Sequence, residues 1–269
     1  MNADRLDQGI AADADLERRF GGLRRLYGEA GYARVRAARV AVIGLGGVGS
    51  WAAEALARSG VARLVLVDLD HITESNINRQ VQALSQTLGM AKVQALHERV
   101  AGIHPGCEVV GIEEFVSPVN WPALLTMDVD AVIDACDQSS AKSALAAWSL
   151  RSGVPLVCVG AAGGKRTAQR VAVEDLADTT HDPLLAGLRQ RLRKDGAAPR
   201  QGRIGLRCVF SRENVAAPAD SRSGDGTLNC HGYGSSVTVT ATFGMVAAGE
   251  VLALLQDPAP SRPGRERPL

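Results

Sequence analysis

Short apolar runs alternate with longer segments of helical character along the first 160 residues of the chain. Such runs are typical of strands that are buried on both faces of a parallel sheet. The predicted strands span residues 39–44, 63–68, 107–112, 130–134 and 155–159, and the predicted helices span 47–59, 90–103 and 139–152. Strands that alternate with helices make right-handed crossovers. The pattern therefore predicts a Rossmann-like α/β fold whose ligand site lies at the carboxyl edge of a mostly parallel sheet.

The pattern changes after Gly160. A strand is predicted at 167–173, followed by an arginine-rich polar region at 188–207 and an irregular polar stretch that reaches Gly234. Residues 236–255 are almost uniformly apolar, and about 20 apolar residues suffice to span a membrane. This segment nevertheless contains Glu250, three threonines and two glycines, and it has no flanking aromatic belt. We expect a helix buried against the sheet and no stable insertion into a membrane.

These elements predict one domain over residues 17–256. Its nucleotide-binding half covers about 38–160, and the later strands and the apolar helix form a C-terminal substrate half at about 161–256. Residues 16–36 are expected to be helical, with an interruption at Gly21-Gly22. Residues 1–16 and 257–269 are expected to be flexible tails.

The composition restricts the class of protein. Hydrophobic residues make up 46% of the 269 residues and charged residues 22%, which excludes a disordered chain and a coiled coil. The net charge is +1, so no overall field indicates a nucleic-acid partner. The five cysteines include no C-x-x-C pair, which argues against a disulfide framework and a four-cysteine zinc site. Without an apolar export segment at the N-terminus, a reducing cytoplasm is the expected compartment.

A glycine-rich motif lies between the first predicted strand and the helix that follows it. It reads Gly44-Leu-Gly46-Gly47-Val-Gly49, and this spacing permits a tight turn and a close approach of backbone to phosphate. The helix offers free N–H groups to an anion. Asp68 ends the second strand 19 residues after Gly49, where a carboxylate accepts hydrogen bonds from ribose hydroxyls. The motif predicts a nucleotide site, but it does not separate NAD from ATP.

Polar residues after Asp68 favour ATP. They are Asp70, Asn76, Arg79, Gln80 and Lys92. Arg79 and Lys92 can neutralise β and γ oxygens and Asn76 can hydrogen-bond to them, whereas a dehydrogenase has no need of this set. The simpler interpretation of Arg79 and Lys92 is a solvated helix face.

Asp137 follows the fourth predicted strand, at the sheet edge where α/β proteins bind ligands. Mg²⁺ prefers carboxylate and phosphate oxygens, so Asp137 is the candidate metal ligand. The simpler interpretation is that Asp137 caps the helix that begins near Ser139.

Four motifs occur together in this chain: the glycine motif, Asp-Leu-Asp at 68–70, Ser-Asn-Ile-Asn-Arg-Gln at 75–80, and the later lysine. With this combination, residues 19–159 resemble the ubiquitin-activating-enzyme-like adenylating superfamily (ThiF, MoeB and HesA). Members of that superfamily bind Mg·ATP and join AMP to a substrate carboxylate. The resemblance implies that Asp68 holds the ribose and that Asn76, Arg79 and Lys92 contact the phosphates. It also implies that Asp137 is the metal ligand and acts in catalysis with Arg79 and Lys92.

A narrower resemblance covers nearly the whole chain. The chain is similar to the subfamily that cyclises threonylcarbamoyladenosine beside the tRNA anticodon. The segments that carry this similarity are residues 19–28, 49–58, 161–164, 182–194, 208–211 and 240–244. This implies that the threonyl carboxylate is adenylated and then attacked intramolecularly, with net loss of water. It also implies a homodimer. It leaves open whether a monovalent cation binds and whether a cysteine desulfurase or another sulfur-transfer protein docks.

The resemblance is incomplete at the N-terminus. Related adenylators place an arginine there that reaches across a dimer to ATP, but Gly22 occupies the matching position, so Arg19 and Arg25 are candidate substitutes. An intramolecular attack needs no thioester cysteine. We therefore expect Cys208 and Cys230 to be packed residues and His231, in a loop, to be solvated.

The arginine-rich region suits an RNA substrate. The chain has 26 Arg and only 4 Lys, and residues 189–207 contain six Arg and one Lys against one acidic residue. Cations of this kind neutralise an RNA backbone without reading its sequence. The candidate tRNA-binding residues are Arg189, Arg191, Arg193, Lys194, Arg200 and Arg203, and Lys165, Arg166 and Arg170 are candidates to extend them. A solvated loop is the simpler interpretation of these charges.

Three other functions stay open on the sequence. The main alternative is adenylation of the C-terminus of a ubiquitin-like sulfur carrier. The others are NAD-dependent redox chemistry, against which the phosphate-binding set weighs, and RNA binding without catalysis.

Overall fold

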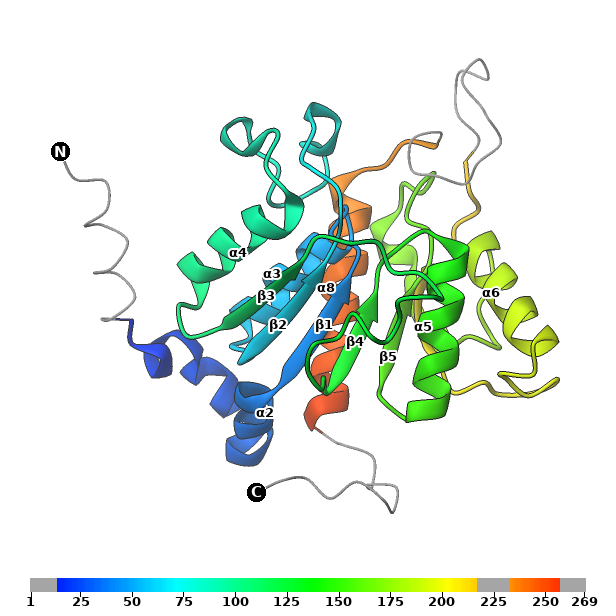
Figure 1. Cartoon of the computed structure of the whole chain (residues 1–269), viewed down its shortest axis with the longest axis horizontal. Coiled ribbons are helices and arrows are strands. Elements are labelled where there is room, and N and C mark those ends of the chain that lie inside the picture. The colour runs from blue at the N-terminus through cyan, green and yellow to red at the C-terminus, as the bar shows by residue number, and fades with distance from the viewer. Residues whose placement is uncertain (1–13, 217–232, 257–269) are drawn as a thin grey trace.

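A seven-stranded sheet forms the centre of the molecule (Figure 1). The structure is a computed structural model that describes residues 14–216 and 233–256. The strands are β1 (Arg39–Ile43), β2 (Arg63–Val67), β3 (Glu108–Ile112), β4 (Ala131–Asp134), β5 (Leu156–Val159), β6 (Val171–Asp175) and β7 (Arg207–Ser211). Their order is β3-β2-β1-β4-β5-β7-β6, and all neighbours are parallel except β6 and β7. The predicted α/β fold with a mostly parallel sheet is confirmed.

Helices cover both faces of the sheet. On one face lie α3 (Gly49–Arg58), α4 (Lys92–Ile103) and α8 (Val237–Gln256), and on the other lie α5 (Ser139–Ser152) and α6 (Pro183–Lys194). The strand β1 shows how one short apolar run fills both cores, because successive side chains point to opposite faces. Val40 and Val42 pack against the first group of helices, whereas Ala41 and Ile43 pack against the second.

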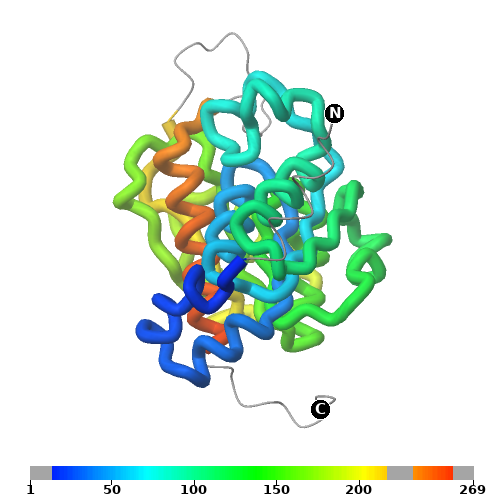
Figure 2. Tube along the Cα trace, turned by 90° about the vertical axis from the view of Figure 1, so that its left-hand side faces the viewer, coloured from blue at the N-terminus to red at the C-terminus, as the bar shows by residue number. Residues whose placement is uncertain are grey.

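The apolar C-terminal segment forms α8, as predicted. Among the described residues, α8 is the one helix whose length and composition would allow it to cross a membrane. One of its faces, which includes Phe243 and Val251, is buried in the core. Figure 2 shows α8 running along the sheet from the edge with loop 70–90 to the edge with α2 (Leu16–Ala37). A Cβ at Gly244 would lie 2.4 Å from the carbonyl oxygen of Val48, so a glycine is required where α8 meets α3.

Two predictions about glycines and chain ends need correction. The helix α2 runs through Gly21-Gly22 without interruption, since a helix tolerates glycine at a cost of about 1 kcal/mol. The kink lies instead at Gly28, whose φ of 69° is open to glycine without strain. Asp15 caps α2 by accepting from the N–H of Arg18, so the ordered helix begins inside the expected tail. The rest of that tail, at 1–13, and the tail at 257–269 lie outside the described residues.

The predictions after Gly160 also need correction. The strand expected at 167–173 begins at Val171, because residues 168–170 form a 3-10 turn. The arginine-rich region starts within α6, which Asp182 caps by accepting from the N–H of Leu185. The stretch expected to be irregular contains β7, which lies between β5 and β6. The apolar part of β7 is only three residues long, Cys-Val-Phe, which is too short to predict a strand among the surrounding polar residues.

His104 is buried at the amino edge of the sheet. Its ring contacts Phe20 with a centroid separation of 4.7 Å, and its Nε2 lies 2.8 Å from Nη1 of Arg36. Burial and the charge of Arg36 together lower the pKa of His104 to about 4. The folded protein therefore holds this imidazole neutral at neutral pH.

Acid is expected to destabilise the fold through His104. Because its pKa is lower in the folded chain, the unfolded chain takes up the proton first, and stability present at pH 7 is lost as the pH falls from about 6.5 to about 4. The free energy of unfolding should fall by at most about 1.4 kcal/mol per pH unit from this group. Urea unfolding at a series of pH values measures the slope. In His104→Gln, which cannot be protonated, the slope should be shallower, and an identical slope would contradict the assignment.

Candidate active site

Three strands of the sheet deliver the candidate residues to one edge. The order of the strands reverses direction between β1 and β4, and α/β proteins bind ligands in the crevice at such a switch point. The glycine motif follows β1, Asp68 follows β2, and Asp137 follows β4. All three therefore lie at the carboxyl edge, which is the upper edge of the sheet in Figure 1.

The glycines of the motif have separate roles. Gly44 has a φ of 84°, and a Cβ there would lie 3.0 Å from the backbone of Ala135. Gly49 has no room for a side chain, because a Cβ would come within 1.7 Å of the carbonyl oxygen of Gly44. Gly46 faces open space, with nothing within 4 Å of its Cβ position. The turn is thus closed on the protein side and open where a ligand can approach.

The helix α3 begins directly at this turn. Its N-cap residue is Val48, and no side chain makes a capping hydrogen bond. Backbone N–H groups in the first turn of a helix without such a cap attract an anion, and the helix dipole adds to the attraction.

Asp68 shapes the glycine-rich turn. It is buried, its Oδ2 accepts from the N–H of Leu45 at 2.6 Å, and its Oδ1 accepts from the N–H of Asp70 at 2.9 Å. A carboxylate oxygen can accept two hydrogen bonds, so capacity remains for a hydroxyl donor such as ribose.

Lys92 is the first residue of α4 and is also buried. Its Nζ lies 2.6 Å from Oδ2 of Asp70 and 3.5 Å from Oδ1 of Asp68. The structure therefore contradicts a solvated helix face for Lys92. Its ammonium screens two carboxylates that would otherwise repel a phosphate.

Arg79 lies over the glycine-rich turn. Its Cγ is 3.1 Å from the Cβ position of Gly47, and its backbone oxygen accepts from Nε1 of Trp51 at 2.9 Å. Its Nη1 donates to the carbonyl of Ser75 and to Oδ1 of Asn78, which orients the guanidinium. Arg79 is half-buried, and these bonds place it at the turn.

Asn76 and Gln80 hold the loop that carries Arg79. Both are buried, and Oδ1 of Asn76 accepts from the N–H of Thr73 at 3.2 Å. Oε1 of Gln80 accepts from Nε2 of Gln82, which also donates to the carbonyl of Leu45 at 2.9 Å. The link from Gln82 to the glycine-rich turn was missed, since nothing marks this glutamine within a polar stretch.

Asp137 is exposed just beyond β4. The cap of α5 is Gln138, which makes no capping bond through its side chain, so the structure contradicts the interpretation of Asp137 as a helix cap. The Asp137 carboxylate makes no hydrogen bond or ion pair to the described residues. Nor does the described part of the chain gather three His, Cys, Asp or Glu side chains as a metal cluster.

Two further features near the site were not predicted. The first is Thr240 of α8, whose Cβ lies 3.3 Å from the Cβ position of Gly47. The second is an ion pair between Asp134 and Lys142, both fully buried beneath the loop that carries Asp137. A charged residue inside the apolar run 131–134 and a lone lysine in a helix of small residues were the signals that could have revealed this pair.

The predicted tRNA-binding residues differ in their exposure and in their hydrogen-bond partners. Arg189 donates through Nη1 to the carbonyls of Leu176 and Thr179, so it holds a loop. Arg193 is half-buried and donates to the carbonyl of Gly202, whereas Lys194 and Arg200 are exposed. Arg203, 84% exposed, contacts Asp175 at 3.4 Å.

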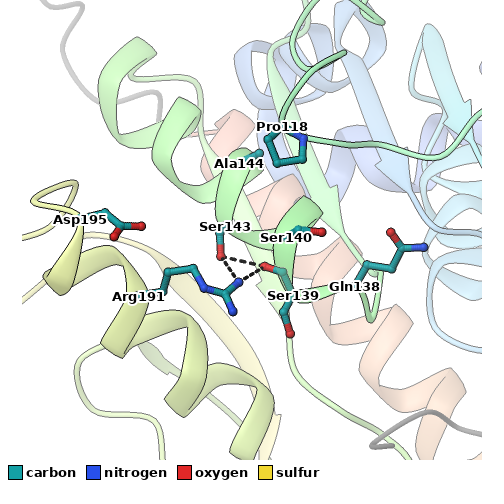
Figure 3. Close-up of a pocket in the computed structure, with 8 residues that line it drawn as sticks. All are labelled: Pro118, Gln138, Ser139, Ser140, Ser143, Ala144, Arg191 and Asp195. Carbon is teal, nitrogen blue, oxygen red and sulfur yellow. Dashed lines mark hydrogen bonds between the residues drawn. The ribbon is translucent and has the colours of Figure 1, made fainter.

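Arg191 lines a cleft between α5 and α6, next to the loop that carries Asp137 (Figure 3). Its Nη1 donates to the carbonyl of Ser139 at 2.7 Å and to Oγ of Ser143 at 2.9 Å. The cleft has a volume of about 860 Å³. Its lining residues are Pro118, Gln138, Ser139, Ser140, Ser143, Ala144, Arg191 and Asp195.

The remaining candidates have structural positions. Lys165 is buried and donates to three backbone carbonyls, those of His181, Ser211 and Glu213, so it does not extend a basic surface. Arg166 and Arg170 are both exposed and still can. Burial lowers the pKa of Lys165, although nearby acidic groups oppose this. Cys208 is fully buried, as expected of a packed residue. Cys230 and His231 lie outside the described residues.

The N-terminal arginines lie far from this edge. Arg19 donates from α2 to the carbonyl of Ile103 at 2.7 Å, at the amino edge of the sheet. Arg25 is exposed on the same helix. Neither reaches the site of its own chain.

Residues 19–266 match the ThiF family. The chain is 42% identical over 244 residues to the tRNA threonylcarbamoyladenosine dehydratase of Haemophilus influenzae, covering 88% of this chain and 93% of that protein. Crystal structures of E. coli tRNA N6-threonylcarbamoyladenosine dehydratase, TcdA, in complex with ATP and with AMP are 40% and 41% identical to it. Each has a TM-score of 0.82 and covers 90% of this chain and 96% of the other. The extent of these similarities, together with the glycine-rich turn and its cations, shows that the chain belongs to the ThiF family, in the branch of the tRNA threonylcarbamoyladenosine dehydratases.

Proposed function

We propose that this chain uses ATP to cyclise threonylcarbamoyladenosine beside the anticodon of tRNA, with net loss of water. The observation that carries the proposal is the open space at Gly46. It lies in a turn that Arg79 contacts, that Asp68 holds beside Lys92, and that leads into the uncapped start of α3. A triphosphate fits this arrangement of positive charge. The similarity to a dehydratase solved with ATP supports the choice of substrate.

The first step activates the threonyl carboxylate. One carboxylate oxygen attacks the α-phosphorus of ATP, the bond from that phosphorus to the bridging oxygen breaks, and pyrophosphate leaves with the electron pair. Negative charge grows on pyrophosphate as it leaves, so nearby cations stabilise the transition state more than the ground state. Arg79 and Lys92 supply these cations.

The second step closes the ring. A nucleophilic atom of the same threonylcarbamoyl group attacks the activated carbonyl carbon and releases its proton, and AMP leaves with the former carboxylate oxygen. Because the nucleophile belongs to the substrate, the protein has to position it and needs no nucleophile of its own. The burial of Cys208 agrees with this.

We assign Asp137 as the protein ligand of Mg²⁺. Magnesium in such sites keeps several waters and takes one or two carboxylates together with substrate phosphates. An exposed carboxylate beside the glycine-rich turn fits that donor set better than a cluster of protein ligands would. When bound, the ion neutralises phosphate charge, and Asp137 would orient it.

We further propose that the protein acts as a homodimer in the cytoplasm. Arg19 and Arg25 lie on α2, at the opposite edge of the sheet from the site of their own chain. An arginine from this helix would therefore serve the site of a second copy.

The direct test supplies the protein with ATP, Mg²⁺ and tRNA that bears threonylcarbamoyladenosine. Mass spectrometry of the nucleosides should find a product lighter by one water, with AMP and pyrophosphate in equal amounts. In Arg79→Ala the yield should fall by at least about 100-fold. If a ubiquitin-like carrier is adenylated and the tRNA is unchanged, the acceptor is the carrier instead. If ATP is never split to pyrophosphate, the proposed function is wrong.

Lys92→Ala is expected to abolish pyrophosphate release and to leave the fold intact. The substitution removes the cation between the phosphates and two carboxylates, so Asp68 and Asp70 would repel the nucleotide. A pyrophosphate-release assay and circular dichroism measure the two effects. Unchanged release would remove Lys92 from the site.

Arg191→Ala is expected to weaken tRNA binding and to lower by about 1 the slope of log affinity against log salt concentration. The reason is that Arg191 is the guanidinium in the cleft beside Asp137. Arg58→Ala is the matched control, since Arg58 is 60% exposed on α3, on the opposite face of the sheet. Equal salt slopes in both variants would show that the cleft does not contact RNA.

A further inference from the structure

A buried ion pair lies directly beneath the loop that carries Asp137. The Nζ of Lys142 is 2.8 Å from Oδ2 of Asp134, and both side chains are 0% exposed. The same ammonium donates to the carbonyl of Val159 at 2.9 Å. The pair thus joins the carboxyl end of β4, the carboxyl end of β5 and the first turns of α5.

Stability alone does not account for this pair. Each buried ion loses its hydration, and apolar residues of similar volume in such a place are often equally stabilising. Burial by itself lowers the pKa of Lys142, but the charge and hydrogen bond of Asp134 together with the neighbouring Cys158 and Cys136 raise it above its usual value, so the amine is protonated. Because both ions lose their hydration and the pair lies at the edge of the site, we ask which part of the backbone it holds in place.

The pair fixes the course of the chain toward Asp137. Oδ1 of Asp134 accepts from the N–H of Cys136 at 3.2 Å and from its thiol at 2.9 Å. Between them, the N–H of Ala135 donates to the carbonyl of Ile43 at 2.8 Å. The turn at 134–136 is therefore tied at consecutive residues, and Asp137 is the next residue.

The same turn forms the wall behind the phosphate loop. The backbone of Ala135 lies 3.0 Å from the Cβ position of Gly44, which leaves no space for the turn to shift toward the glycines. Asp134 holds this backbone from one side and Lys142 holds Asp134 from the other.

We propose that the Asp134–Lys142 ion pair is the positioning device for Asp137 and thereby sets the Mg²⁺ requirement of the site. This inference rests on the proposed function, since it takes Asp137 as the magnesium ligand. Groups that hold a metal ligand from behind typically change metal affinity or activity by 10–100-fold when they are substituted. Asp134 and Lys142 act through Asp137 and touch neither substrate nor ion.

The test compares Lys142→Met with the wild-type protein, using the full chain. Two quantities are measured against Mg²⁺ concentration: ATP–pyrophosphate exchange with the modified tRNA, and binding of a fluorescent ATP analogue. The Mg²⁺ concentration at half-saturation should rise by about 10-fold or more in both. Binding of the analogue without Mg²⁺ should change by less than about twofold, and high Mg²⁺ should restore much of the exchange rate.

A second variant separates positioning from folding. Lys142→Met leaves the Asp134 anion buried without its partner, which destabilises the fold. The double variant Asp134→Asn with Lys142→Met removes both charges, so its melting temperature should return toward that of the wild type while the Mg²⁺ defect persists. If stability and Mg²⁺ dependence both return to wild-type values, the pair is structural only and the inference fails.

Two control variants accompany this test, one that should show the Mg²⁺ defect and one that should not. Asp137→Asn should show a Mg²⁺ defect of the same kind. Arg99→Met removes a cation from another buried carboxylate, Glu54, at 2.6 Å, and should lower the melting temperature without changing the Mg²⁺ dependence. If the wild-type protein never forms pyrophosphate, the proposed function fails, whereas the Mg²⁺ dependence of nucleotide binding still decides the inference.

Discussion

The structure depends on how closely the chain approaches itself between β1 and α3. A Cβ at Gly49 would come within 1.7 Å of the carbonyl of Gly44, and one at Gly44 would press on the backbone after β4. Two strand ends and a helix start can meet at one point only because side chains are missing there. This close approach packs the turn after β4, which leads to Asp137, against the start of α3.

Carboxylates and a lysine lie together beneath this turn. The oxygens of Asp68 accept from backbone N–H groups, and Lys92 pairs with both Asp68 and Asp70. The single ammonium thus reduces the negative charge of the two carboxylates that shape the turn. The same logic recurs one layer deeper, where Lys142 compensates Asp134. In both places a carboxylate accepts from backbone N–H groups and a buried lysine pairs with it.

Sequence patterns predicted the parallel core well because its strands are continuous apolar runs and its glycine motif is local. They failed where the signal is short or depends on distant packing. The strand β7 has only three apolar residues, and its place between β5 and β6 follows from pairing on both sides. The pair Asp134–Lys142 and the contact of Thr240 with the glycine turn join residues whose proximity no spacing rule encodes. Arg189 belongs to the predicted charge cluster, yet backbone carbonyls occupy its guanidinium.

The position of α8 has a consequence for synthesis of the chain. The glycine turn at 44–49 leaves the ribosome long before the helix that packs against it. In that helix, Gly244 lies beside Val48 and Thr240 beside Gly47. During synthesis the glycine-rich turn is therefore exposed for some time without the helix that covers it. The turn reaches its folded packing only after residues 240–244 have been added to the chain.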